Sequence, residues 1–194
     1  MVCSNGVDIS KFTYEFAPCR KELVFIGNMF SAQNFDAAIW FSKNVLPLFR
    51  KYGNYTFKVI GKIKPDDKQR LEKFKGTIVT GAVDDVVVHA RGAIAGICSV
   101  RLAAGVQNKI LEYMALGLPT VSSSMGHEGL DAKAGVEILI ANTPEEYVEQ
   151  ILRLEKDKEF AQSISEKALV YVNDHHSWSG KLKPVLDAVH EIVK

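Results

Sequence analysis

Short apolar runs alternate with amphipathic stretches along most of the chain. The apolar runs fall at residues 22–27, 55–61, 77–81, 93–100, 118–122 and 136–140. Nearly continuous apolar runs of this length are typical of strands buried on both faces of a sheet. Apolar residues recur with helical spacing in the stretches 34–52, 65–74, 84–90 and 106–116. The alternation predicts an α/β fold, namely a doubly wound parallel sheet with helices on both faces.

Local signals place the ends of several of these helices. Asn34 is a candidate N-cap for the stretch 34–52, and Pro47 should bend its last turns. Asp84 should cap the short helix at 84–90, and neighbouring Asp85 is also best explained as a cap.

From residue 143 onward the pattern predicts helices only. Thr143 and Glu146 form a capping-box pattern, with Pro144 at the first helical position. Two or three helices should follow to Lys194. Residues 143–194 are therefore expected to form a set of C-terminal helices on a Rossmann-like domain.

Composition narrows the classes of function. The chain has 194 residues and a net charge of +1, which suits one domain and provides no basic surface for nucleic acid or anionic lipid. No apolar run approaches the length of about 18 residues that spans a membrane. Three cysteines without paired spacing argue against a disulfide framework or a zinc site, and Cys98 reads as a small buried hydrophobe. The N-terminus has no signal-peptide pattern, so we expect a cytoplasmic protein.

Ligands of doubly wound sheets bind outside the carboxyl ends of the strands. Gly27 and Asn28 follow the first predicted strand, where a glycine allows a tight turn and a close approach to a ligand. The fingerprint G-x-G-x-x-G is absent, which argues against a nicotinamide or flavin enzyme. On local evidence alone, Asn28 is better explained as an ordinary turn residue or cap.

The end of the fourth predicted strand carries the strongest signal for an anion site. Arg101 follows the strand, Gly105 ends a loop of small residues, and a helix is expected to begin near Val106. A helix N-terminus presents free N–H groups to an anion, and Lys109 lies in the first turn. Arg101 and Lys109 could thus converge on a phosphate. The alternative is that both are solvated surface charges.

Glu112 is the only charged residue between Ile110 and Val121. An ionised carboxylate in so apolar a segment needs partners. Sugar hydroxyls are suitable partners, because a carboxylate can accept two hydrogen bonds at once. A local ion pair with Lys109, three residues earlier, is the alternative.

The loop after the fifth predicted strand, residues 122–129, is polar and is expected to be flexible. It carries His127 and Glu128 beside the same site. His127 invites a catalytic interpretation, although a lone histidine in a loop is more often merely exposed. No catalytic residue is assigned from the sequence, and no cluster with ligand spacing predicts a metal site.

Residues 101–129 resemble the donor-binding signature of GT-B glycosyltransferases of the large group-one family, which build cell-surface polysaccharides. The segment EYMALGLP at 112–119 fits the family pattern of a Glu followed by Met-Ala-x-Gly-x-Pro. Arg101, Gly105 and Lys109 match an Arg-x-x-x-Gly-x-x-x-Lys run of exopolysaccharide sugar transferases. Further resemblances lie at residues 5–8, 23–28 and 79–84 and at Trp178.

The resemblance implies roles for individual residues. Glu112 would hold the ribose hydroxyls of a nucleotide, and Arg101 and Lys109 would face the diphosphate or the sugar. Backbone N–H groups of Gly105 and Val106 would meet phosphate, and Gly27 with Asn28 would approach the diphosphate from the first loop. Residues 127–128 would lie near the donor sugar.

One departure from the family concerns position 104. Many members carry a second Glu there that contacts the donor sugar, whereas this chain has Ala104. The resemblance therefore does not extend to the sugar contact or to the stereochemical outcome of transfer.

The resemblance also predicts the organisation of the protein. Residues 1–194 would form a single donor-binding domain, one half of a GT-B fold, entered through an interdomain segment at 1–20. The N-terminal acceptor domain is expected to be absent from this chain. The expected function is binding of a nucleotide-diphosphate sugar for transfer to a saccharide or lipid-linked acceptor. The enzyme would be a hexosyltransferase that needs no cofactor, and the isolated domain would be inactive.

Two alternatives remain at this point. A nucleotide-sugar epimerase on a related fold would need carboxylates and a histidine at the cleft. A non-catalytic flavodoxin-like module would need acidic residues after the first strand, where this chain has Gly27 and Asn28. In the glycosyltransferase reading, the full-length enzyme could lie at the inner face of the membrane without a membrane span.

Overall fold

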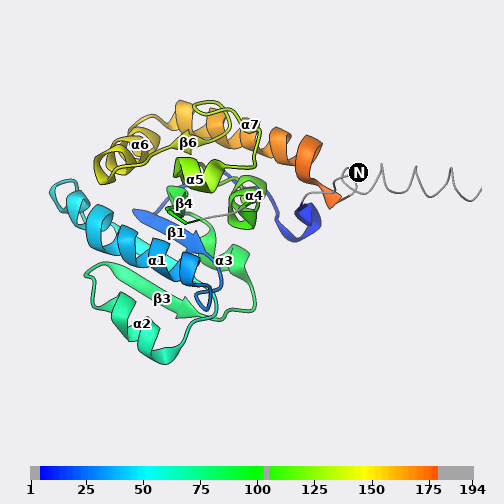
Figure 1. Ribbon diagram of the computed structural model, residues 1–194. Coiled ribbons are helices and arrows are strands. Elements are labelled where there is room, and N and C mark those ends of the chain that lie inside the picture. The colour runs from blue at the N-terminus through cyan, green and yellow to red at the C-terminus, as the bar shows by residue number, and fades with distance from the viewer. Residues whose placement is uncertain (1–4, 103–104, 179–194) are drawn as a thin grey trace, which may run out of the picture.

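The computed structural model describes residues 5–102 and 105–178 and contains a six-stranded sheet (Figure 1). Its strands are β1 (Glu22–Ile26), β2 (Thr56–Ile60), β3 (Thr77–Gly81), β4 (Ala95–Cys98), β5 (Thr120–Ser122) and β6 (Leu139–Ile140). The order is β3-β2-β1-β4-β5-β6, and every neighbouring pair is parallel. The predicted doubly wound parallel sheet is confirmed, and the order of the strands reverses between β1 and β4.

Helices cover both faces of this sheet. They are η1 (Ile9–Lys11), α1 (Ala32–Trp40), η2 (Phe41–Val45), η3 (Leu46–Lys51), α2 (Pro65–Glu72), α3 (Val86–Ala90), α4 (Asn108–Leu116), α5 (Ser124–His127), α6 (Pro144–Lys156) and α7 (Lys158–His176). Leu23 and Phe25 of β1 pack in one buried cluster with Phe41, whereas Val24 and Ile26 pack in a second cluster. The alternation of side chains along β1 therefore feeds two cores, as two-sided burial requires.

The stretch predicted as one helix from Asn34 to Tyr52 differs from that prediction. It begins earlier, with Ser31 as N-cap, and Asn34 lies inside the first turns of α1. The helix then changes to the wider π form in η2 and to the tighter 3₁₀ form in η3, where Pro47 lies at the start. Proline lacks the N–H that would continue the α-helical ladder, so the helix changes type around it.

Three further boundaries differ from the sequence predictions. Asp85, not Asp84, caps α3, and its carboxylate accepts hydrogen bonds from the N–H groups of Val87 and Val88. Helix α4 begins at Asn108, so Val106 precedes it. Part of the loop expected to be flexible forms a helical turn, α5, in which the Ser123 side chain accepts a hydrogen bond from the Gly126 N–H. Short polar segments of this kind carry no periodicity from which a sequence pattern could predict them.

The C-terminal part agrees with its signals. Thr143 and Glu146 form the predicted capping box of α6, and α7 ends at His176, where the sequence predicted a break. Residues 179–194, which the sequence assigned to the last C-terminal helix, lie outside the described residues. Within the part that the structure describes, no helix has the length and apolar character needed to cross a bilayer.

Residues 5–20, which we call the entry segment, lie along α4. The Asn5 side chain donates to the Asn108 side chain at one end of this helix (3.0 Å), and the Glu15 N–H donates to the Leu116 carbonyl at the other (3.1 Å). The Val7 N–H donates to the His176 carbonyl (2.8 Å). The entry segment is thereby joined both to α4 and to the end of α7.

Candidate functional site

A pocket of about 480 Å³ lies where the sheet reverses its strand order, at the carboxyl ends of β1 and β2 and the N-terminus of α4. Its lining residues are Ile26, Gly27, Asn28, Asn34, Ile60, Gly61, Lys62, Val86, Asn108, Lys109 and Glu112. Four of the residues singled out from the sequence are therefore gathered in one place, namely Gly27, Asn28, Lys109 and Glu112. Such a crevice is where doubly wound sheets bind their ligands.

Two glycines bring the ends of β1 and β2 into close contact at this pocket. A Cβ atom on Gly61 would lie 2.0 Å from the carbonyl oxygen of Gly27, and Gly61 has a φ of +139°. Only glycine fits both the space and the backbone conformation. The wall of the pocket next to Gly27 is consequently bare backbone, which a ligand can approach closely.

Asn28 has a structural role in the turn that follows β1. Its side-chain oxygen accepts a hydrogen bond from the Phe30 N–H (3.1 Å), and its carbonyl accepts one from the Asn34 side chain (3.0 Å). The interpretation of Asn28 as a turn residue thus has a physical basis. The same turn also brings Asn28 to the edge of the pocket, so the two interpretations are compatible.

Lys109 is not a solvated surface charge, because its residue is only 7% exposed. Its ammonium group donates to the side-chain oxygen of Gln107 (3.1 Å) and lies 5.3 Å from the centre of the Phe25 ring. Burial lowers the pKa of Lys109, and nearby Cys98 and Glu112 offset part of this effect. Among the described residues no carboxylate forms an ion pair with it. A buried cation in this state gains most from an added anion.

Glu112 lies one turn further along α4, on the same wall of the pocket. Its side chain is half-buried, and burial raises its pKa, an effect that the charge of Lys109 partly offsets. Across residues 5–102 and 105–178 the carboxylate has neither a hydrogen bond nor an ion pair. The local ion pair with Lys109 considered from the sequence is therefore not formed. The oxygens of Glu112 remain available to accept hydrogen bonds from a ligand.

Arg101 lies in a different place from the one that its sequence position suggested. Its guanidinium pairs with Asp36 of α1 and lies over the Trp40 ring, in a separate pocket of about 370 Å³. The structure thus does not bring Arg101 together with Lys109. An expectation from sequence spacing could not anticipate this, because the partner carboxylate is 65 residues away.

Gly105 and Val106 precede α4 and do not line the pocket. Gly105 has a φ of +75°, and its carbonyl accepts a hydrogen bond from the Gln107 side chain (3.3 Å). Gln107 also accepts a hydrogen bond from Gln33 of α1 (3.1 Å). The turn before α4 is therefore tied to both α1 and Lys109. Ala104, the position of the departure noted from the sequence, lies outside the described residues.

His127 and Glu128 lie at the end of α5, away from the pocket lining. A ring nitrogen of His127 lies 2.7 Å from the carbonyl of Ala132, and Glu128 is exposed. The histidine is engaged locally rather than merely exposed. In the part of the chain that the structure describes, no three or more His, Cys, Asp or Glu side chains are grouped in a way that could hold a metal ion.

Three lining residues with polar or charged side chains were missed from the sequence. Asn34 was interpreted as a helix cap, and Asn108 and Lys62 were not singled out. Lys62 is exposed at the rim, two residues after β2 ends. Applying the strand-end rule to β2 as well as to β1 and β4 would have found it.

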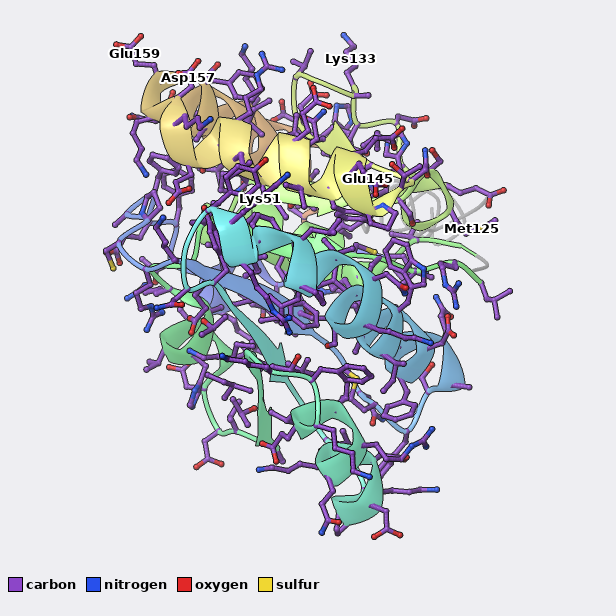
Figure 2. All side chains as sticks on the ribbon, turned by 90° about the vertical axis from the view of Figure 1, so that its left-hand side faces the viewer. Lys51, Met125, Lys133, Glu145, Asp157 and Glu159 are labelled. Carbon is purple, nitrogen blue, oxygen red and sulfur yellow. The ribbon has the colours of Figure 1, made fainter. Side chains whose placement is uncertain are left out.

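A larger groove of about 670 Å³ lies between η3 and α6. Figure 2 views this side of the molecule, with Lys51 on η3, Glu145 in the first turn of α6 and Asp157 just after the end of α6. Its charged groups are mixed in sign and its floor is apolar. Because it lies away from the pocket at the reversal of the strand order, we assign the candidate site to the smaller pocket.

Comparisons with known proteins identify the family of the chain. The family model described as glycosyl transferases group 1 matches residues 20–157. A protein of Klebsiella pneumoniae, described as an uncharacterized 44.6 kDa protein in the cps region, is 23% identical over 163 residues. The match covers 79% of this chain and 42% of that protein, so the chain spans about two-fifths of its relative's length.

Solved structures show the same fold. The Anabaena protein HepE, in complex with UDP, superposes with a TM-score of 0.78 at 13% identity, covering 98% of this chain and 57% of that one. The C-terminal domain of LpcC, a glycosyl transferase group 1 family protein from Francisella tularensis, gives a TM-score of 0.68 at 16% identity, covering 89% of this chain and all of that domain. Because this family model matches more than half of its residues, the chain belongs to the group 1 glycosyl transferases.

Proposed function

We propose that the pocket between β1, β2 and α4 binds a nucleotide-diphosphate sugar as the donor for glycosyl transfer. The acceptor would be a saccharide or a lipid-linked saccharide in cell-surface polysaccharide synthesis, held by a second domain. The relative encoded in a cps region and the UDP in HepE agree with this proposal. We place the reaction in the cytoplasm and assign it no cofactor.

The proposal rests mainly on two neighbouring groups in the pocket, a buried cation without an ion-pair partner and a carboxylate without a hydrogen-bond partner among the described residues. Lys109 is buried without an ion-pair partner among the described residues, and Glu112 presents carboxylate oxygens one helical turn away. A nucleoside diphosphate supplies what each lacks, an anion for Lys109 and a pair of ribose hydroxyls for Glu112.

The surrounding backbone favours the same ligand. The N-terminus of α4 directs free N–H groups and a partial positive charge toward the pocket, where Asn108 is the first helical residue. Gly27 presents bare backbone on the opposite wall, and Lys62 adds a second cation at the rim. We assign the diphosphate to the space between Lys109, the α4 terminus and the Gly27–Asn28 turn.

The remaining candidates from the sequence do not line the pocket and would contact the ligand only under additional conditions. Arg101 could reach a ligand only after leaving Asp36. His127 and Glu128 would meet the donor sugar only if it extended past the pocket lining. Neither alternative function gains support from the described residues, because His127 is engaged with Ala132 and no acidic group follows β1 directly.

The test is calorimetric titration of the 194-residue chain with UDP, GDP and ADP, followed by the nucleoside of whichever binds. Lys109→Met retains the buried volume and removes the charge. It should weaken diphosphate binding about 10- to 150-fold, the loss of one charge-assisted hydrogen bond, and leave nucleoside binding within about twofold. Lys133→Met, at the exposed Lys133 labelled in Figure 2, is the matched control and should change neither affinity.

Two results would contradict the proposal. One is that none of the three nucleotides binds the unaltered chain. The other is that Lys109→Met weakens nucleoside and diphosphate equally, which would indicate a general disturbance of the fold rather than a lost contact with the anion.

A further inference from the structure

The hydroxyl group of Tyr113 lies between two strands of the sheet. It accepts a hydrogen bond from the Ile26 N–H of β1 (2.8 Å) and donates one to the Ile97 carbonyl of β4 (3.1 Å). Tyr113 belongs to α4 and is fully buried. A single side chain thus joins a helix to the two strands on either side of the reversal in strand order.

The pairing of the strands shows what this hydroxyl replaces. β1 pairs with β2 along its whole length, up to Ile26, but pairs with β4 only at Leu23 and Val24. Beyond Val24 the strands β1 and β4 separate, and the Tyr113 hydroxyl bridges the backbone groups of Ile26 and Ile97 that a continuous ladder would join directly. Because buried backbone groups need partners, the separation depends on this bridge.

Gly96 provides the space for the aromatic ring. A Cβ atom at this position would lie 2.3–2.6 Å from three carbons of the Tyr113 ring. Real Cβ atoms do not approach ring carbons so closely, so any other residue would displace the ring or the strand. The ring therefore lies directly against the backbone of β4, and its position is determined by both strands.

The consequence concerns the two walls of the donor pocket. One wall is the end of β1 at Ile26, Gly27 and Asn28, and the other is the turn of α4 that carries Lys109 and Glu112. Tyr113 is the residue after Glu112 in α4, and its hydroxyl is hydrogen-bonded to the Ile26 N–H. We propose that Tyr113 is a positioning residue that sets the separation of these walls, an inference that rests on the proposed donor-binding function.

The test compares two buried tyrosines that differ in what they bridge. Tyr113→Phe retains the ring against Gly96 and removes the hydroxyl. Tyr147→Phe is the matched control, because the Tyr147 hydroxyl is also buried and also donates to a β4 carbonyl, that of Cys98 (3.2 Å), but is not bonded to β1. Both substitutions should lower the melting temperature, by roughly 2–12 °C. Tyr113→Phe should lower it more, because it removes the partner of two backbone groups, whereas the Cys98 carbonyl keeps a hydrogen bond from the Ser123 N–H.

Affinity should distinguish the two variants. With whichever of UDP, GDP and ADP binds the unaltered chain, Tyr113→Phe should weaken binding about tenfold, or about 1.4 kcal/mol, and Tyr147→Phe less than twofold. Amide hydrogen exchange at Ile26 should accelerate only in Tyr113→Phe, because only this variant removes the acceptor of that N–H.

The outcomes separate the two proposals. Equal affinity losses in both variants, or unchanged Ile26 exchange in Tyr113→Phe, would overturn the positioning role while leaving donor binding intact. Absence of nucleotide binding by the unaltered chain would overturn the donor assignment, and the role of Tyr113 at a donor pocket with it. Exchange at Ile26 would then report only a structural bridge.

Discussion

Arg101, at the end of β4, is clamped by Asp36 of α1 through both oxygens of the carboxylate. One terminal nitrogen of the guanidinium lies 2.8 and 2.9 Å from these oxygens, and the Nε lies 3.2 Å from one of them. Both side chains are partly exposed, so such a pair contributes at most about 1 kcal/mol to stability. An interaction this weak can exchange with a diphosphate, which offers the same geometry to a guanidinium.

Asp36→Asn should therefore release Arg101 toward an anionic ligand. We expect a nucleoside diphosphate to bind about two- to fivefold more tightly, within the roughly 1 kcal/mol of an exposed pair. Calorimetric titration of Asp36→Asn, Arg101→Ala and the double variant forms a cycle. The gain should vanish in the double variant, because Arg101 is the group that moves. If Asp36→Asn and Arg101→Ala both leave the affinity unchanged, Arg101 serves only to hold α1.

Glu112→Gln tests the ribose contact. The substitution retains the shape of the side chain and removes the charge, and it should cost about 1.5–3 kcal/mol of nucleotide binding. The same variant should bind a nucleoside proportionally more weakly, since the ribose is present in both ligands. Titration calorimetry measures both affinities.

Glu149→Gln is the matched control for this experiment. Glu149 is an exposed carboxylate on α6, on the wall of the groove between η3 and α6 rather than at the pocket. Its substitution should leave nucleotide affinity unchanged. Unaltered binding by Glu112→Gln as well would assign that carboxylate no part in ligand recognition.

Glu112 and Lys109 should affect the free energy of unfolding in opposite directions as the pH rises. Burial raises the pKa of Glu112 above its ordinary value of 4.5, so its contribution to stability is full below pH 4.5 and is lost as the pH rises through the folded-state pKa. Burial lowers the pKa of Lys109 below 10.5, so its contribution is full above pH 10.5 and is lost as the pH falls through the folded-state pKa.

Variants without these charges should gain stability in the corresponding windows. Relative to the unaltered chain, Glu112→Gln should become more stable as the pH rises from about 4.5 toward neutral, and Lys109→Met as it falls from about 10.5. Urea unfolding at several pH values measures both differences. A difference for Glu112→Gln that shrinks with rising pH would contradict the buried environment of this carboxylate.

The sheet could be predicted from the sequence because each strand corresponds to a short apolar run that is flanked by turn residues. The same rule placed Gly27 and Lys109 at one edge, since the carboxyl ends of parallel strands lie together. Strand lengths were less predictable. Burial extends beyond the ladder, so apolar runs such as 93–100 are longer than the strand Ala95–Cys98 that they contain.

Side-chain pairs between distant elements could not be predicted. Two examples are the contact of Arg101 with Asp36 and that of Tyr113 with Gly96, which form only once the sheet and its helices have packed. The sequence around one residue of such a pair does not indicate which residue it will contact. Asn34 illustrates the reverse error. Asparagine is a common helix cap, so the sequence suggested that role. In the structure the Asn34 side chain instead donates to the Asn28 carbonyl in the turn after β1, and its residue type alone could not distinguish the two roles.

The 194-residue chain should bind the donor but should not transfer sugar efficiently. Catalysis between two substrates depends on holding them in contact, which can account for roughly 7–11 kcal/mol of the barrier, and in our proposal the acceptor is held by a second domain. The chain spans 42% of its Klebsiella relative and 57% of HepE. Asn28 and Lys62 at the pocket rim are exposed, so donor phosphates bound here would remain near water, where fixed charges act weakly. The assay combines the chain, donor and a saccharide or lipid-linked acceptor, first alone and then with an acceptor domain from a relative added or fused. Transfer by the chain alone on the order of 1–1,000 per second, the range of complete enzymes, would show that this domain needs no partner for catalysis.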